Sequence, residues 1–253
     1  MTDHNDTQIL RSAMSLHRMW KQGKLGGEVM PEDVHPNLAK DSKELLHYLT
    51  LGMCLNYQRN SYKLWEACTA AYFDDDVNWI FSPELVAATD ENHLRPALIK
   101  HKVALQPNKH TNNWSRVSGG IVKYGQGDMR LILEKGDYDI AKIRNFIQTN
   151  RKNFPYLAGE KICNYWLFVL LQYTSFPIRN RRALTIAPDT HVLNASARLG
   201  LLSIDDLGKA NAQTVCSNAW ERLLSDSGYL PIDFHTPLWL WSRLGYPQII
   251  PAP

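Results

Sequence analysis

The sequence has no long hydrophobic run. Its longest apolar stretch, Tyr165 to Leu171, is seven residues, whereas a membrane-spanning helix needs roughly 20. The first residues, Met1 to Asp6, are polar and acidic, so no secretory signal is expected there. We therefore expect no membrane partner and a location in the cytoplasm or nucleoid, or in the nucleus if the cell is eukaryotic.

Cysteine is also scarce, and histidine is not arranged for metal binding. The four cysteines are far apart and form no CxxC pair, which argues against zinc, iron–sulfur clusters and a disulfide framework. The nine histidines show no HxxxH spacing, and the acidic run 74–76 is expected to be a solvated turn. We predict no metal and no organic cofactor. The cysteines, expected to be reduced core thiols, are Cys54, Cys68, Cys163 and Cys216.

An excess of one charge is missing as well. Lys plus Arg number 28 and Asp plus Glu number 25, a net charge of +3. This balance excludes a histone-like polycation, so any contact with nucleic acid must come from a local patch. With 44% hydrophobic and 21% charged residues, the composition excludes long disordered segments and favours a folded chain with a substantial core.

Strand-like alternation is absent, and helical periodicity dominates the chain. We predict an all-α fold without internal repeats. The expected helices cover residues 9–20, 38–55, 61–73, 83–88, 111–124, 138–150, 159–173, 190–199, 205–225 and 234–244, with one more beginning at Asp90.

The first segment with chemical interest runs from Phe154 to Leu167. A turn ending at Gly159 leads into a helix that is apolar on nearly every side and therefore buried. Lys161 lies in the first turn, where a cation opposes the positive end of the helix dipole. Two interpretations remain open: a lysine whose charge stays in water, or a lysine kept partly neutral, as an amine nucleophile requires.

The second segment runs from Ile186 to Gly200. Asp189 is placed to cap the N-terminus of a helix, and Gly200 to end it at the C′ position. Asn caps nearly as well as Asp, so capping alone predicts that Asp189→Asn changes stability by less than about 1 kcal/mol.

The order of these segments resembles that in the helix-hairpin-helix DNA glycosylases of the endonuclease III superfamily. In that family a hairpin L-P-G-V-G-x-K-T-A-N carries the catalytic Lys, and a later V-D-T-H-V-x-R-x-x-x-R-L-G segment carries the catalytic Asp. An upstream L-S-x-Q helix end supplies a Gln that fills the gap left by an extruded base, and Leu55 to Gln58 is similar to it. The matching residues are Gly159, Lys161 and Asn164 in the hairpin, then Asp189 to Val192 and Arg198 to Gly200.

Other features are similar to the archaeal 8-oxoguanine DNA glycosylase branch of this superfamily. The spacing between Lys161 and Asp189 is longer than in endonuclease III, with an insertion at 175–185, and no C-terminal four-cysteine cluster is present. The late segment 234–240 is similar to that branch's H-x-D-T-x-L-W-L helix. Residues 56–73 resemble its early aromatic segment. The hairpin departs from the family at 156–158, where Tyr-Leu-Ala replaces Pro-Gly-Val.

The resemblance implies a two-lobed helix-hairpin-helix glycosylase fold with the active site between the lobes. Residues 43–183 would form the central lobe, and 1–42 with 184–253 the second. The substrate would be double-stranded DNA with a damaged base that is extruded from the duplex, and the protein a monomer. Backbone amides after Gly159 would hold a phosphate. Further backbone contacts are expected from Arg179, Arg181 and Arg182, unless that loop is only solubilising.

The resemblance also implies the chemistry. Lys161 would attack C1′ of the sugar, expel the base and nick the strand, making the protein a glycosylase with abasic-site lyase activity. Asp189 would stabilise the developing positive charge or help to deprotonate the lysine. The extruded base would lie between two aromatic rings, with 8-oxoguanine favoured and oxidised pyrimidines second. The base-binding residues expected are Tyr165, Trp239, Trp65 and Gln58, of which Gln58 is also the residue that would fill the duplex.

Two alternatives belong to other classes of protein. One is an enzyme that cleaves the N-glycosidic bond of a free modified nucleotide or of RNA. The other is a DNA-binding member of the fold without catalysis. Affinity for duplex DNA that falls steeply with salt distinguishes DNA binding from the first alternative.

Overall fold

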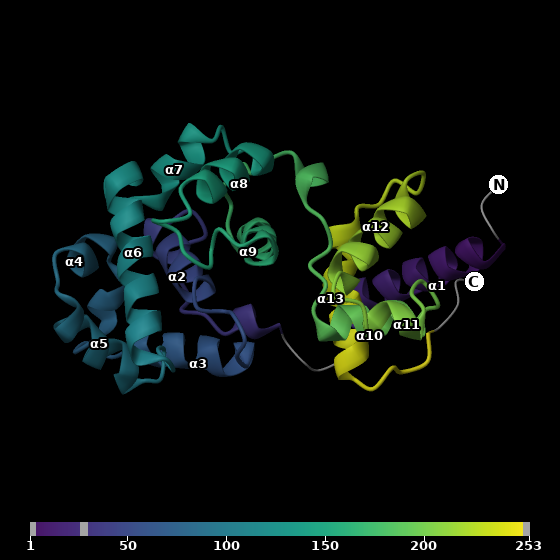
Figure 1. Ribbon diagram of the computed structural model, residues 1–253, viewed down its shortest axis with the longest axis horizontal. Helices are drawn as coiled ribbons and strands as arrows, with labels where there is room; N and C mark the ends of the chain where they lie inside the picture. Colours follow the sequence, from purple (N-terminus) through teal and green to yellow (C-terminus); the bar gives the residue numbers. More distant parts are fainter. Residues whose placement is uncertain (1–3, 26–29, 250–253) are drawn as a thin grey trace. The chain divides into compact units, whose positions relative to one another are not determined.

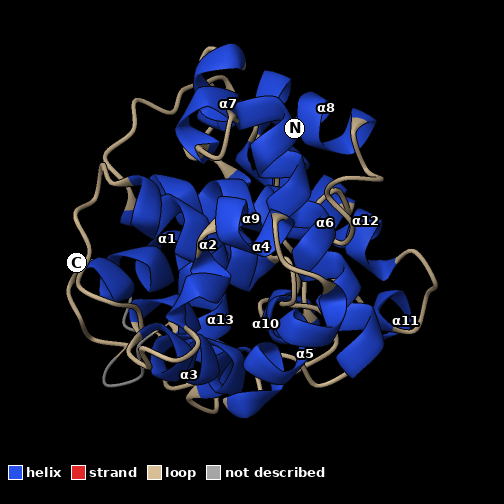
Figure 2. Ribbon diagram, turned by 90° about the vertical axis from the view of Figure 1, so that its left-hand side faces the viewer, coloured by secondary structure: helices blue, strands red, loops and turns tan. Residues whose placement is uncertain are grey.

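The computed structural model describes residues 4–25 and 30–249, and helices joined by loops and turns make up these ranges (Figure 2). No strand occurs in them; an isolated bridge between Asp139 and Arg179 is the sole β-type pairing given for them. The all-α class predicted from the sequence is confirmed. None of the described helices is both long and apolar enough to cross a bilayer.

The chain divides into two compact units, which are treated separately below. The central unit is Met30–Ala183, and the terminal unit combines Met1–Val29 with Leu184–Pro253. The central unit ends after residue 183. It begins at Met30, so residues 30–42, assigned above to the second lobe, group with the central unit. The physical reason is that Glu32 and Asp33 bond to tyrosine and tryptophan side chains of that unit.

The central unit contains eight of the described α-helices and three short 3-10 turns (Figure 1). Helix α2 packs against α3, α7 and α9, and α6 packs against α4 and α5. The helices are α2 (Lys43–Met53), α3 (Ser61–Tyr72), α4 (Pro83–Ala87), α5 (Glu91–Lys100), α6 (Pro107–Gly125), α7 (Met129–Lys135), α8 (Ile140–Thr149) and α9 (Glu160–Tyr173); the turns are η1 (Pro31–Asp33), η2 (Asn78–Phe81) and η3 (Arg181–Ala183).

Helix starts in this unit are set by short polar side chains that accept hydrogen bonds from first-turn amides. Ser42 accepts from the amide of Leu45, so α2 begins at Lys43 rather than at the predicted Leu38. Asp128 caps α7 in the same way. That seven-residue helix was not predicted, because it is too short to show a clear period.

Three tryptophans anchor the central core, and each indole N–H has a partner. Trp114 donates to the carbonyl of Ile80 at 2.8 Å, and Trp166 donates to the hydroxyl of Thr50 at 3.1 Å. Trp65 donates to the carboxylate of Glu32. All three rings are fully buried, which is favourable because the polar end of each indole is satisfied.

The terminal unit contains α1 (His4–Lys21), α10 (Thr190–Arg198), α11 (Ile204–Leu207), α12 (Ala212–Leu224), the turn η4 (Pro231–Phe234) and α13 (His235–Arg243). Its core includes a stack of Trp220 on Phe234 with centroids 5.2 Å apart. The predicted helix 205–225 is two helices, because Ser203 and Asp206 form a capping box for α11, which ends at Gly208. Gly200 has φ +86° and closes α10 as predicted. Its amide donates to Ala197 and the next amide donates to Ser196, the Schellman pattern.

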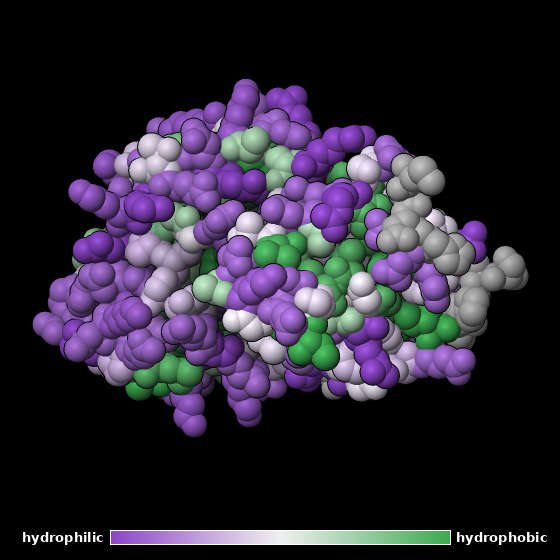
Figure 3. Space-filling model, turned by 45° about the vertical axis from the view of Figure 1, so that its right-hand side comes forward, coloured by the Kyte–Doolittle hydropathy of each residue, from purple (hydrophilic) through white to green (hydrophobic). Residues whose placement is uncertain are grey.

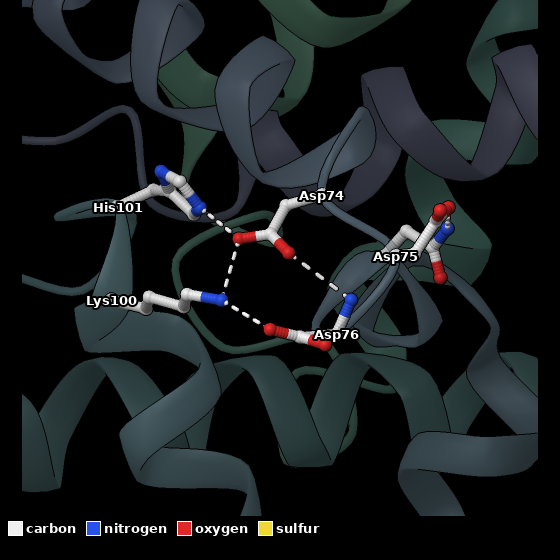
Figure 4. A network of polar contacts seen from close by, with 6 residues as sticks. Asp74, Asp75, Asp76, Lys100 and His101 are labelled. Carbon is white, nitrogen blue, oxygen red and sulfur yellow. Dashed lines mark hydrogen bonds and ion pairs between the residues drawn. The ribbon is translucent and has the colours of Figure 1, made fainter.

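The acidic run 74–76 forms a surface network and not a metal site (Figure 4). Asp74 accepts hydrogen bonds from His101 at 2.5 Å and from Lys100 at 2.8 Å, and these bonds hold the pKa of Asp74 well below its usual value. Lys100 also pairs with Asp76 at 2.8 Å. The network ties the end of α3 to the end of α5. No group of His, Cys, Asp and Glu in the described ranges is arranged to hold a metal ion.

All four cysteines are buried and unpaired, as the sequence predicted. The face shown in Figure 3 is mostly hydrophilic, with separate apolar patches. Among the described residues, the large hydrophobic side chains that are exposed include Tyr57 at 44%, Phe73 at 69% and Leu105 at 53%.

Candidate active site

The turn before α9 is built for close backbone approach. The amide of Gly159 donates to the carbonyl of Tyr156 at 2.9 Å. A Cβ at position 159 would lie 3.0 Å from that same oxygen, so a larger residue would push the turn apart. Gly159 is the N-cap of α9, and no side chain caps this helix. As in every α-helix, the first-turn amides have no acceptor within the helix and face its N-terminal end, which is the property expected of a phosphate-binding end.

Lys161 lies in the first turn of α9, the position the sequence predicted, and its side chain is exposed. The residues that follow it are mainly buried, and Tyr165 lies one turn further along the same face. The structure therefore places an amine and a tyrosine ring along one side of α9, at its N-terminal end.

Glu32, which the sequence analysis did not single out, joins two of the predicted base-binding residues. Its Oε1 accepts from the indole Nε1 of Trp65 at 3.2 Å, and its Oε2 accepts from the hydroxyl of Tyr165 at 3.0 Å. The side chain is 1% exposed, and burial raises the pKa of Glu32 to about 7, against the two hydrogen bonds that favour the carboxylate. The residue therefore sits near the midpoint of its titration at neutral pH.

Glu32 had no detectable signal in the sequence. It lies in η1, a three-residue turn that has no helical period, and Pro31-Glu32-Asp33 reads as an ordinary exposed turn. Neighbouring Asp33 accepts from the hydroxyl of Tyr173 at 2.6 Å. The two bonded acids fasten this turn to α9.

The other two residues expected near the base occupy different environments in this unit. Trp65 is fully buried and its N–H is committed to Glu32. Gln58 is exposed in the connection between α2 and α3, with a left-handed φ of +52°. The buried position of Trp65 suits a residue that holds Glu32 in place, and the exposed position of Gln58 suits a residue that contacts a ligand.

In the terminal unit, Asp189 has both carboxylate oxygens engaged. Oδ1 accepts from the amide of Val192 at 2.9 Å, the predicted cap of α10. Oδ2 accepts from the indole Nε1 of Trp239 at 3.1 Å. The expectation of a mild effect for Asp189→Asn therefore needs correction, because an amide cannot accept through both of its ends.

Trp239 is surrounded by polar groups on α10 and α13. The His191 ring meets it edge-on at 5.4 Å between centroids, and the guanidinium of Arg243 lies 5.2 Å from its ring centre. His191 in turn contacts the hydroxyl of Ser242 at 3.1 Å through Nδ1. This arrangement fixes the ring plane and places a cation over one face of it.

The arginine loop is partly ordered by its backbone. The amide of Arg179 donates to Tyr138 at 2.9 Å, and its carbonyl accepts from Ile140 at 3.1 Å. The side chains of Arg179, Arg181 and Arg182 are exposed at the end of the central unit. Their position is compatible with contacts to an anionic backbone.

Neither a scan against protein-family models nor a search of curated proteins finds a match to this sequence. The interpretation therefore depends on the residues and geometry described above.

Proposed function

We propose that the protein is a base-excision DNA glycosylase with abasic-site lyase activity, built on the two-lobed helix-hairpin-helix fold. The observation that carries the proposal is the uncapped start of α9, with exposed Lys161 directly after the Gly159 turn. A nucleophile at the N-terminal end of a helix suits an anionic substrate, because helix N-termini bind phosphate while the amine reaches the adjacent sugar.

In the proposed reaction, the lone pair of Lys161 Nζ bonds to C1′ of the deoxyribose. The bond from C1′ to the base breaks, and the base leaves with the electron pair and takes up a proton. The sugar ring opens to a Schiff base between Lys161 and C1′. Loss of a proton from C2′ then expels the 3′ phosphate and nicks the strand. No cofactor is required for these steps.

The hydrogen bonds of Asp189 suit a carboxylate that stabilises positive charge on the substrate. Two donors hold its carboxylate in one orientation, so it does not need to reorganise when positive charge develops on the sugar. In the proposed fold, Lys161 and Asp189 act on the same nucleotide. Trp239 then has two roles, stacking on the base and orienting Asp189.

We favour 8-oxoguanine as the substrate base. The N7 hydrogen that distinguishes it from guanine requires an acceptor, and we assign that role to the exposed side-chain amide of Gln58, because both oxygens of buried Glu32 already accept from Trp65 and Tyr165. Aromatic rings such as Tyr165 and Trp239 contribute about 1–3 kcal/mol per stacked base but do not select among flat bases. Selection is therefore assigned to the hydrogen bond from the base to Gln58.

The test is covalent trapping with borohydride, which reduces a Schiff base to a stable amine. Duplexes carrying one 8-oxoguanine or one thymine glycol are incubated with the protein and separated under denaturing conditions. We expect a covalent complex and strand nicking with 8-oxoguanine, and loss of both in Lys161→Gln. The matched control is Lys209→Gln, an exposed lysine of the terminal unit that pairs with Asp206, which should trap normally.

Two outcomes contradict the proposal. A complex that survives Lys161→Gln assigns the nucleophile elsewhere. Cleavage of thymine glycol without cleavage of 8-oxoguanine refutes the substrate assignment.

A further inference from the structure

A stacked aromatic pair lies at the surface of the central unit, next to Gln58 and to the turn that ends at Gly159. The rings of Tyr57 and Tyr156 stack with centroids 5.2 Å apart and planes 30° from parallel. Tyr57 is 44% exposed, and Tyr156 is partly exposed. The pair joins the α2–α3 connection to the turn before α9.

The connection between α5 and α6 is hydrogen-bonded to the α2–α3 connection that carries Tyr57. The guanidinium of Arg59 donates to the carbonyls of Val103 at 2.7 Å and Lys102 at 3.2 Å, which lie between α5 and α6. At the start of α6, the ammonium of Lys109 lies 5.1 Å from the ring centre of Tyr156. Three connections distant in sequence therefore converge on one surface.

The backbone of this surface is held in an unusual conformation. Each connection contains one non-glycine residue in the left-handed region: Gln58 at φ +52°, Lys102 at +62° and Tyr156 at +59°. Such residues cost free energy and are concentrated where a surface must hold a fixed shape for a ligand. The carbonyl of Tyr156 also receives the Gly159 amide, so the ring and the proposed phosphate site share one turn.

Charge on the three connections has a single sign. Residues 54–60, 101–106 and 150–159 contain Arg59, Lys102, Arg151 and Lys152 and no Asp or Glu. Lys109 adds a further cation at the edge. A stacked aromatic pair with the Lys109 ammonium 5.1 Å from one ring centre has the composition of surfaces that bind unpaired nucleic-acid bases, in which rings stack on bases and cations meet phosphates.

We propose that the Tyr57–Tyr156 pair is a stacking platform for one unpaired nucleobase of DNA, distinct from the pocket for the excised base. The inference rests on the proposed function, since extrusion of a nucleotide is what leaves a base unpaired. A paired base has both faces covered by its neighbours. A base beside a disrupted step exposes a face that a tyrosine ring can cover.

The experiment measures binding without catalysis. A DNA duplex carries the fluorescent base 2-aminopurine opposite a tetrahydrofuran abasic analogue, which has no C1′ carbon able to form a Schiff base. Stacking on an aromatic ring quenches 2-aminopurine. We expect the full chain to bind this duplex with quenching, and Tyr57→Leu to bind it about 5- to 150-fold more weakly and without quenching.

The controls separate stacking from folding. Tyr57→Phe keeps the ring and should quench like the unaltered protein. Phe73→Leu removes another exposed aromatic ring of the same unit and should change nothing. Lys109→Gln should reduce the slope of log affinity against log salt by about one.

The outcomes also distinguish this inference from the proposed function. If the protein nicks lesion DNA and Tyr57→Leu still quenches 2-aminopurine fully, the platform is overturned and the catalytic proposal is not. Quenching that depends on Tyr57 without any nicking supports the platform and overturns the catalytic proposal. Binding of an RNA duplex of the same sequence with no binding of the DNA overturns the assignment to DNA.

Discussion

Replacing Asp189 by Asn tests the arrangement around this carboxylate inside a single unit. The carboxylate accepts from the Val192 amide at 2.9 Å through one oxygen and from the Trp239 indole at 3.1 Å through the other. An amide side chain has one acceptor. If its oxygen keeps the cap, its NH2 group faces the indole N–H; if it turns over, the cap is lost.

Either orientation leaves two donors facing each other. Hydrogen bonds to charged groups contribute about 1.5–3 kcal/mol, and an unsatisfied buried donor costs about 1–3 kcal/mol. We therefore expect Asp189→Asn to lower the free energy of unfolding by about 1–3 kcal/mol, more than a cap exchange alone would. The loss should be measured by urea unfolding followed with far-UV circular dichroism.

A double-mutant cycle with Trp239→Phe isolates the cause. Phe keeps an aromatic ring but has no N–H, so the amide of Asp189→Asn meets no opposing donor in that background. The double variant should be more stable than the sum of the single changes predicts, by about 1–2 kcal/mol. If the two changes add within about 0.5 kcal/mol, the Trp239 bond does not restrain Asp189 and the reasoning is refuted.

Two other predictions concern charge. Because burial raises the pKa of Glu32 from 4.5 to about 7, the folded state holds a proton that the unfolded state releases, so stability falls as pH rises from about 4.5 through 7, by on the order of 3 kcal/mol from this group. Glu32→Gln cannot ionise, so its unfolding free energy should show a flatter pH profile; parallel profiles would refute the buried ionisation. Replacing Arg181 and Arg182 together by Gln should reduce the salt slope of duplex binding by about two, as measured by fluorescence anisotropy, and an unchanged slope would make that loop solubilising only.

The sequence predicted those parts of the fold that repeat with a helical period or carry a local terminator. The helix after Gly159, the cap at Asp189 and the left-handed Gly200 are examples, because each depends on residues within one turn of it. Short helices were not predicted, since the seven residues of α7 form less than two helical turns and show no clear periodicity.

A residue of the candidate site could be predicted from the sequence only where its residue type and its position in a local motif suggest a role. Lys161 and Asp189 belong to that class. The role of Glu32 depends on partners 33 and 133 residues away, Trp65 and Tyr165, and no local pattern encodes burial of an acid in a three-residue turn. The hydrogen bond from Trp239 to Asp189 was not predicted for the same reason, because the two residues are 50 positions apart in the sequence.

The interruption of the terminal unit by the central one sets an order of events during synthesis. Residues 30–183 contain every segment of their own unit and can fold once they leave the ribosome. Helix α1 is made before the central unit, yet its buried face, with Ile9, Ala13 and Leu16, packs on α12, α13 and η4. Synthesis adds about 5–20 residues per second. Residues 184–253 are therefore completed on the order of ten seconds after the central unit, and α1 cannot pack against them before then. During that interval the apolar face of α1 lacks its packing partners α12, α13 and η4, so a helix made before the central unit is buried after it.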